Sequence, residues 1–161
     1  MSLDEVYTVR RVGAQDLAVL SLFRCRMFGE FWDGPVDAAA MNVRDEAFFG
    51  PLLAGGDAAA WLGETKAGEA VASAIVVVYT LPPKPWAVDG RTAYVCSMFT
   101  DPAHRRRGLA RRLFGECLEF SRALGVSCAT LHAAPLGRPL YESFGFAATN
   151  EMRLPLGADK P

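Results

Sequence analysis

Polar and hydrophobic residues follow two different periods along the chain, and each period predicts one kind of element. Residues 6–12 alternate between polar and apolar types, as in a strand with one face in the core. Four later segments are rich in apolar and β-branched residues and have the length of strands. They cover residues 58–65, 69–79, 92–100 and 126–133, and the turn Lys66-Ala67-Gly68 predicts that the first two form a hairpin.

Three other segments repeat their apolar residues every three or four positions, which is the period of a helix packed on a core. The first begins at Asp16 and ends at the helix-breaking pair Gly34-Pro35. The second covers residues 36–53, with an interruption expected near Gly50-Pro51. The third begins after Gly108, ends at Gly125 and has one apolar face, made by Leu109, Leu113, Cys117, Phe120 and Leu124.

The order of the elements in the second half predicts a crossover between parallel strands. The strand at 92–100 leads through a loop that begins Asp101-Pro102 into the third helix, and the strand at 126–133 follows. For parallel strands this connection is right-handed and places the helix N-terminus at the carboxyl edge of the sheet. Because no repeat, low-complexity tract or long linker separates the elements, we expect one domain over residues 1–161.

The composition limits the class of protein. Hydrophobic residues make up 51% of the chain, enough for a substantial core. The longest apolar run, residues 70–81, is shorter than the roughly 20 residues of a membrane-spanning helix, and the N-terminus has acids where a signal peptide has bases. These features predict a soluble cytoplasmic protein with no membrane partner. The four cysteines have no C-x-x-C spacing, so we expect reduced thiols, no disulfide and no metal site.

Five arginines crowd around the glycine that precedes the third helix: Arg105, Arg106, Arg107, Arg111 and Arg112. Cations are locally unfavourable there, because a helix N-terminus carries the positive end of the helix dipole and N–H groups without partners. An anion bound among the arginines would remove the conflict, and Gly108 and Ala110 leave room for its close approach. The stretch predicts a site for phosphate or pyrophosphate, although a solvated charged helix face has the same composition.

The charge balance favours a compact anion over a long polyanion. The chain has 17 Lys and Arg against 18 Asp and Glu, a net charge of −1, and without the five clustered arginines the balance would be −6. A general nucleic-acid binder spreads basic charge more widely, so we expect no nucleic-acid partner. The nucleotide-binding motifs G-x-G-x-x-G and G-x-x-x-x-G-K-[ST] are both absent.

Two motifs in this half resemble signatures of the Gcn5-related N-acetyltransferases (GNAT). The stretch "MFTDPAHRRRGLARRLF" is similar to the R/Q-x-x-G-x-G/A loop with which the family binds acetyl-CoA, and "LYESFGF" is similar to its Y-x-x-x-G-F signature. The motifs stand in the family's order, about thirty residues apart, as a βαβ unit requires. The resemblance covers residues 92–156. It implies the α/β fold of the family: a mixed, mostly antiparallel twisted sheet flanked by helices, with a βαβ unit that binds acetyl-CoA.

The resemblance places acetyl-CoA, as the acyl donor, on named residues. It implies that the pyrophosphate is held by backbone N–H groups of Arg105, Arg106, Arg107, Gly108, Leu109 and Ala110, with Arg111 adjoining. The preceding strand would bind the pantetheine arm through the backbone of Met98, Phe99 and Thr100.

The family's tyrosine corresponds to Tyr141, whose phenol would lie near the donor sulfur and assist departure of the thiolate. Many members have an asparagine seven residues before this tyrosine, where this chain has Ala134. That contact to the pantetheine arm is therefore missing or replaced.

The sequence identifies the acceptor-binding residues less clearly than the donor-binding residues. Glu30 and Glu151 are the best candidates for a general base, because their segments border the acceptor cleft in similar proteins, but surface carboxylates have the same pattern and water can relay the proton instead. The resemblance implies direct transfer to a primary amine of a small molecule or a peptide. Phe31, Trp32 and Trp86 could shape the acceptor pocket. Dimers are common in similar proteins, so a homodimer is an option.

Three other interpretations compete with direct acetyl transfer. A covalent mechanism would use Ser97 or Cys96 beside His132, but the sequence has no G-x-S-x-G elbow and no recognisable orienting acid. A non-catalytic acyl-CoA-sensing module would keep the arginine loop and lose the amine chemistry. A nucleic-acid-binding module would place the same arginines on phosphates, which the acidic remainder of the chain disfavours.

Overall fold

The structure, a computed structural model, describes residues 3–154 and 156. The chain divides into two compact units, Met1–Leu131 and His132–Pro161. The first unit contains all five strands and four helices, and the second contains one short helix.

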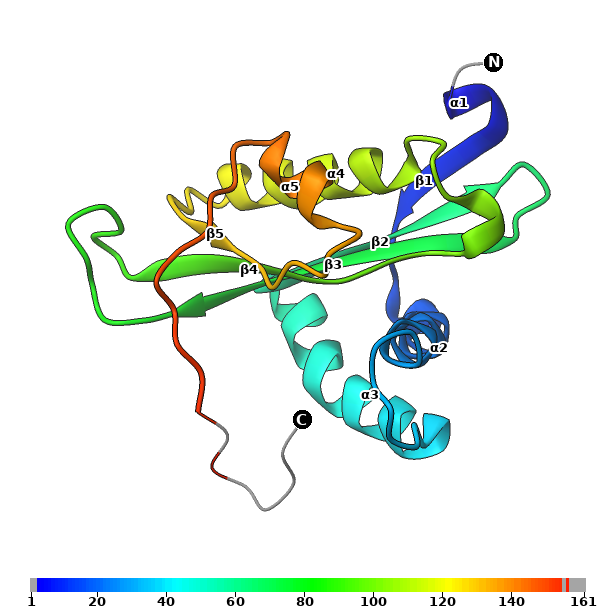
Figure 1. The fold of residues 1–161 in the computed structure, drawn as a ribbon, viewed down its shortest axis with the longest axis horizontal. Helices are drawn as coiled ribbons and strands as arrows, with labels where there is room; N and C mark the ends of the chain where they lie inside the picture. The colour runs from blue at the N-terminus through cyan, green and yellow to red at the C-terminus, as the bar shows by residue number, and fades with distance from the viewer. Residues whose placement is uncertain (1–2, 155, 157–161) are drawn as a thin grey trace. The chain divides into compact units, whose positions relative to one another are not determined.

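The strands of the first unit form one mixed sheet in the order β1-β2-β3-β4-β5 (Figure 1). They are β1 Tyr7–Arg11, β2 Ala58–Thr65, β3 Ala70–Thr80, β4 Arg91–Thr100 and β5 Ala129–Thr130. The first four pair antiparallel with their neighbours, whereas β5 runs parallel to β4. This arrangement confirms the predicted α/β fold, including its single parallel pair.

Helices cover both faces of the sheet, as Figure 1 shows: α2 and α3 lie on one face and α4 lies on the other. The helices of this unit are α1 Leu3–Val6, α2 Leu17–Phe28, α3 Ala38–Gly55 and α4 Leu109–Ala123, with short 3₁₀ turns at Ala14–Asp16 and Pro102–His104. Leu20, Phe23, Phe49 and Phe99 form the centre of the core between α2, α3 and the sheet. Their burial places the centre of the core on the α2 and α3 side of the sheet.

Proline 51 does not interrupt the second helix, so that sequence prediction is wrong. Pro51 lies inside α3, which continues to Gly55. Proline removes one backbone hydrogen bond, but Phe49 is buried before it and Leu52 and Leu53 pack against the same core after it. Tertiary packing on both sides of the proline holds the helix together.

The last strand is much shorter than the predicted residues 126–133. β5 has two residues, paired as Ala93↔Ala129 and Tyr94↔Thr130. Just beyond these pairs, the register between β3 and β4 shifts, and Ser97 adopts a positive φ of 55°. A bulge of this kind bends a strand and ends its pairing, which accounts for the short β5.

Gly63 in β2 marks a close approach of α4 to the sheet. A Cβ atom at this position would lie 2.8 Å from Cδ1 of Leu109, the first residue of α4. Leu109 is only 1% exposed. The strand glycine therefore lets the first turn of α4 settle on the sheet and fixes the position of the helix N-terminus.

Within the described residues, the structure shows neither a disulfide nor a membrane-spanning helix. Cys25, Cys96, Cys117 and Cys128 are free thiols in the structure. Over residues 3–154 and 156, no helix combines the length and the apolar character needed to cross a membrane.

Candidate active site

The loop between β4 and α4, residues 101–108, ends at a helix N-terminus that has no side-chain cap. Gly108 precedes the helix with a φ of 86°, a left-handed conformation that glycine adopts without strain. The first turn of α4 contains no acidic residue. An α-helix leaves its first N–H groups without acceptors inside the helix, and here they include those of Gly108, Leu109 and Ala110. The geometry is that of an anion-binding helix terminus.

Two ion pairs fasten this loop to the end of α2. Arg26 donates a hydrogen bond to Asp101 at 2.6 Å, and Arg105 pairs with Glu30, which follows α2. Arg105 also donates from Nε to the carbonyl oxygen of Thr100 at 2.9 Å. The hydrogen bond from Arg26 is the main reason why the pKa of Asp101 lies below its ordinary value. The Arg105 side chain and the candidate base Glu30 thus both take part in holding the loop.

Tyr7 of β1 holds the loop from a second direction. Arg107 donates from Nη1 to the Tyr7 hydroxyl oxygen at 3.2 Å and from Nη2 to the carbonyl oxygen of Ala103, also at 3.2 Å. The same hydroxyl lies 2.9 Å from Nδ1 of His104. Because Tyr7 is buried, it gives the loop a fixed anchor, and the Arg107 side chain shapes the loop from within.

Arg106 differs from its neighbours. Its φ of 63° lies in the left-handed region, which strains a residue that has a Cβ atom. Its side chain is exposed and makes no hydrogen bond or ion pair with the described part of the chain. Arg112, by contrast, pairs with Glu116 at 3.2 Å. The guanidinium of Arg106 is therefore available to a ligand.

The strand before the loop has an edge that β5 does not cover. β5 pairs only with Ala93 and Tyr94, so Met98, Phe99 and Thr100 have no strand partner on that side among the described residues. Backbone groups on such an edge can bind an extended ligand. These are the three residues that the sequence analysis assigns to the pantetheine arm.

A buried ion pair adjoins the bulge in β4, and sequence reasoning missed it. Arg24 donates from Nε to both carboxylate oxygens of Asp45, at 3.1 and 3.0 Å, and from Nη1 to Oγ of Ser97. The side chains of Arg24 and Asp45 are only 16% and 7% exposed. The Arg24 guanidinium also lies 5.4 Å from the ring centre of Phe28 and 5.0 Å from that of Phe49. A cation at position 24, four residues after the buried Leu20, was the available signal in the sequence.

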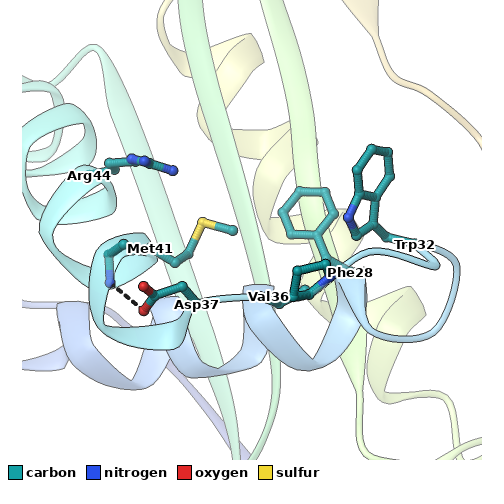
Figure 2. A pocket seen from close by; sticks show the side chains of 8 residues that line it. Phe28, Trp32, Val36, Asp37, Met41 and Arg44 are labelled. Atoms are coloured by element: carbon teal, nitrogen blue, oxygen red, sulfur yellow. Dashed lines mark hydrogen bonds between the residues drawn. The ribbon is translucent and has the colours of Figure 1, made fainter. Parts of the chain in front are cut away.

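A pocket of about 380 Å³ lies between the end of α2, the loop that follows it and the start of α3 (Figure 2). Its walls are mainly apolar, and its two charged residues are Asp37 and Arg44. Trp32, one of the three aromatic residues expected at an acceptor pocket, lines it, whereas the exposed Phe31 and Trp86 do not. Because Phe28 lines the pocket and also packs on Arg24, the pocket adjoins the buried ion pair and, through it, β4.

The second unit contains Tyr141, which is 9% exposed and belongs to α5 Arg138–Glu142. The segment after the helix has the hydrogen bonds of a Schellman motif: Phe146 N–H donates to the Tyr141 carbonyl at 3.2 Å and Gly145 N–H to that of Glu142 at 2.9 Å. Gly145 has a φ of 92°, and the rings of Tyr141 and Phe146 lie 6.5 Å apart. The Y-x-x-x-G-F pattern thus corresponds to a helix end, which accounts for every feature of the motif except the Tyr141 hydroxyl.

Glu151 lies in the same unit as an exposed carboxylate. Its Oε1 is 3.4 Å from Nε2 of His132, and that nitrogen accepts a hydrogen bond from Arg153 at 2.6 Å. The candidate residues are therefore divided between the units, with Glu30 and the arginine loop in the first and Tyr141 and Glu151 in the second.

The structure offers little support for a covalent nucleophile or a metal. Burial raises the pKa of the Cys96 thiol, and Oγ of Ser97 accepts a hydrogen bond from Arg24. A buried thiol of high pKa is a poor nucleophile. Within the described ranges, no group of three or more His, Cys, Asp or Glu side chains is arranged to bind a metal.

The comparisons with known proteins agree on one family. The model of the acetyltransferase (GNAT) family matches residues 18–146. The GCN5-related N-acetyltransferase from Ralstonia eutropha JMP134 is 29% identical, with a TM-score of 0.84 over 93% of this chain and 98% of that one. The predicted acetyltransferase with acetyl-CoA from Clostridium acetobutylicum is 25% identical, with a TM-score of 0.85 over 93% and 96%.

More distant structures share the fold alone. Glucosamine-6-phosphate N-acetyltransferase from Arabidopsis thaliana is 15% identical, with a TM-score of 0.69 over 95% of this chain and 99% of that one. No curated protein sequence matches the chain.

Proposed function

Because the chain belongs to the GNAT acetyltransferase family, we propose that it transfers an acetyl group from acetyl-CoA directly to a primary amine of a small molecule or a peptide. One observation carries the proposal: α4 begins without a side-chain cap or an acid, at the end of an arginine-rich loop that follows a strand whose residues 98–100 have one edge without a strand partner among the described residues. The structure from Clostridium acetobutylicum, which contains acetyl-CoA, supports the choice of donor. Since the family match spans both units, we also propose that residues 1–161 act as one catalytic domain.

The residues present fit the pyrophosphate of CoA. A Cβ atom at Gly108 would meet nothing closer than Cδ1 of Leu3, at 4.0 Å, so the surface at this point is open to a ligand. The N–H groups of Gly108, Leu109 and Ala110 would bind the phosphate oxygens, and Arg106 would add a positive charge. The backbone of residues 98–100 would hold the pantetheine arm. Bound in this way, the donor supplies an activated thioester, whose carbonyl carbon the amine attacks.

Proton transfer is assigned to side chains of both units. When the carbon–sulfur bond breaks, the departing thiolate needs a proton or a hydrogen bond, and we assign this role to the Tyr141 hydroxyl. A phenol has a pKa of about 10 and an alkyl thiol one of about 8.5, so hydrogen bonding contributes as well as proton transfer. The amine would lose its proton to Glu30, Glu151 or water. The ion pair with Arg105 favours a positioning role for Glu30, which leaves Glu151 and water as the stronger candidates.

Steady-state release of free CoA thiol, measured with acetyl-CoA and a panel of primary amines, tests the proposal. We expect release that depends on the amine, with the acetylated amine identified by mass spectrometry. Calorimetric binding of CoA without release by any amine would favour the acyl-CoA-sensing module instead. Salt-dependent binding to DNA or RNA that CoA fails to displace would favour a nucleic-acid-binding module.

A further inference from the structure

The pocket beside α2 combines an aromatic end with a charged end. Figure 2 shows the rings of Phe28 and Trp32 towards one end and Arg44 towards the other. Trp32 is 43% exposed, so part of its ring is in contact with water. A ligand with an apolar body would remove this surface from water, which favours binding.

Arg44 has no partner in the part of the chain that the structure describes. It is exposed and forms no hydrogen bond or ion pair with the residues that the structure describes. The acidic residues that follow it in the sequence are engaged elsewhere, Asp45 with Arg24 and Glu46 with Asn42 at 2.9 Å. An arginine of this kind presents a planar set of donors that suits an anion with two oxygens.

The other charge in the pocket limits which anion fits. Asp37 caps α3, accepting a hydrogen bond from the Ala40 N–H at 3.0 Å, and its negative charge stays in the pocket. Arg44 carries a single positive charge, which one singly charged anion balances. A phosphate dianion would exceed the charge of Arg44 and be repelled by Asp37. A carboxylate is therefore the better ligand.

The position of Phe28 gives the bound molecule a direction. Phe28 lies 5.4 Å from the Arg24 guanidinium, which donates to Ser97 of β4, the residue before the three assigned to the donor. The Phe28 end of the pocket is thus linked to the donor strand. We infer that the acceptor is an amino-acid-like compound, with an amine at this end, an apolar or aromatic body against Phe28 and Trp32, and a carboxylate on Arg44. The inference rests on the proposed function and specifies its acceptor.

Matched pairs of amines test this assignment. The values of kcat/KM for 4-(aminomethyl)benzoic acid, 4-(2-aminoethyl)benzoic acid and 6-aminohexanoic acid, whose amine and carboxylate lie at opposite ends of an apolar body, are referred to the neutral amine. They are compared with those for benzylamine, phenethylamine and pentylamine, which lack the carboxylate. We expect the wild-type protein to prefer at least one acid over its partner by about tenfold or more, the effect of a charge-assisted hydrogen bond. Arg44→Met should abolish the preference by raising KM for the acid while leaving KM for acetyl-CoA unchanged, and Arg44→Lys should keep part of it.

A control arginine separates this effect from a general loss of charge. Arg122→Met on α4, on the other face of the sheet, removes an exposed arginine that pairs with Glu119, and it should change no preference. The assignment is overturned if no acid is preferred by the wild-type protein, or if the preference survives in Arg44→Met.

A binding measurement separates the pocket assignment from the proposed function. Calorimetry with CoA-saturated protein compares the N-acetyl derivatives of the same three acids in the wild type and in Arg44→Met. Binding that Arg44→Met weakens at least about tenfold, without acetyl transfer to any amine, would keep the pocket assignment and reject the proposed function. Transfer to amines without a carboxylate, with no binding of any of the three acids, would do the reverse.

Discussion

The loop before α4 and the pocket beside α2 belong to the same unit but are built in opposite ways. In the loop, Asp101, Arg105 and Arg107 turn inward to Arg26, Glu30 and Tyr7, so the site is left to backbone N–H groups. In the pocket, the lining comes from the end of α2, the loop after it and the start of α3, and the exposed side chains of Trp32 and Arg44 define the surface.

This difference explains why the two regions differ in what their sequences reveal. A backbone site requires particular φ values, here the positive ones at Arg106 and Gly108, so it restricts the sequence to a motif. A side-chain site can be built from many residue types, and its ligand changes when they change. We therefore expect the donor side to respond sharply to backbone substitutions and the acceptor side to change its specificity instead.

The largest effect is expected where the two regions meet. Arg24 packs on Phe28 of the pocket and donates to Ser97 of β4, so Arg24→Met should damage both sides. It also leaves Asp45 buried without its partner, which should lower the free energy of unfolding by about 3–5 kcal/mol, measured by urea denaturation. The double variant Arg24→Met with Asp45→Leu removes both charges and should recover much of this stability. It should not recover acetyl transfer, because the contact to Ser97 is still lost; full recovery would assign the pair to stability alone.

Gly108→Val tests the backbone character of the donor side. The substitution places a β-branched residue at a φ of 86° and in the path of the pyrophosphate, so CoA should bind about 100-fold more weakly or worse by calorimetry. Arg106→Gln should cost about tenfold or less, since several donors share the anion. Gly115→Ala, where an added Cβ has no neighbour within 4 Å, is the matched control and should leave affinity unchanged. Normal affinity in a folded Gly108→Val protein would remove the loop from the donor site.

Tyr141→Phe distinguishes chemistry from helix termination. The ring and its contact with Phe146 are kept, so the Schellman motif and the donor affinity should change little. If the hydroxyl assists the thiolate, turnover at saturating substrates should fall about 10²-fold. Tyr79→Phe, at the end of β3, is the control. Equal turnover, with chemistry shown to be rate-limiting, would leave Tyr141 as a packing residue and make water the proton source.

The smallest effect concerns the ion pair between Asp101 and Arg26, which weakens at acidic pH. The pKa of Asp101 is lowered, first by the hydrogen bond from Arg26, so the charged carboxylate stabilises the folded state. This contribution is complete above the ordinary aspartate pKa of about 3.9 and is lost as the pH falls through the lowered value. Because the pair is partly exposed, we expect less than about 1 kcal/mol. Urea denaturation between pH 5 and pH 2 should show a weaker pH dependence for Asp101→Asn than for the wild type, and an identical dependence would contradict the contribution.

The sequence predicts the fold wherever a period or a glycine marks it. The hairpin turn at Gly68 and the end of α4 at Gly125 both have positive φ values, of 84° and 72°, and both were expected from the glycines. The bulge in β4 was not expected, because the left-handed residue there is Ser97 rather than glycine. The continuity of α3 through Pro51 was also missed, since it depends on packing that local propensity does not contain.

The sequence likewise predicts some residues of the candidate site and not others. The residues of the arginine loop follow from their motif, but the roles of Arg105 and Arg107 do not, because their partners Glu30 and Tyr7 lie 75 and 100 residues away in the sequence. Arg44 has no motif at all. It becomes a candidate only when the fold places it in the same pocket as Phe28 and Trp32.

The contact between Gly63 and Leu109 has a consequence for how this sequence can evolve. An added methyl at position 63 would meet the leucine at 2.8 Å, so either residue alone resists change. A smaller residue at position 109 would make room for a larger one at position 63. The two positions should therefore vary together among close relatives, and the coupling energy from the cycle Gly63→Ala, Leu109→Ala should be favourable. This pair would set how high the anion-binding end of α4 stands above the sheet.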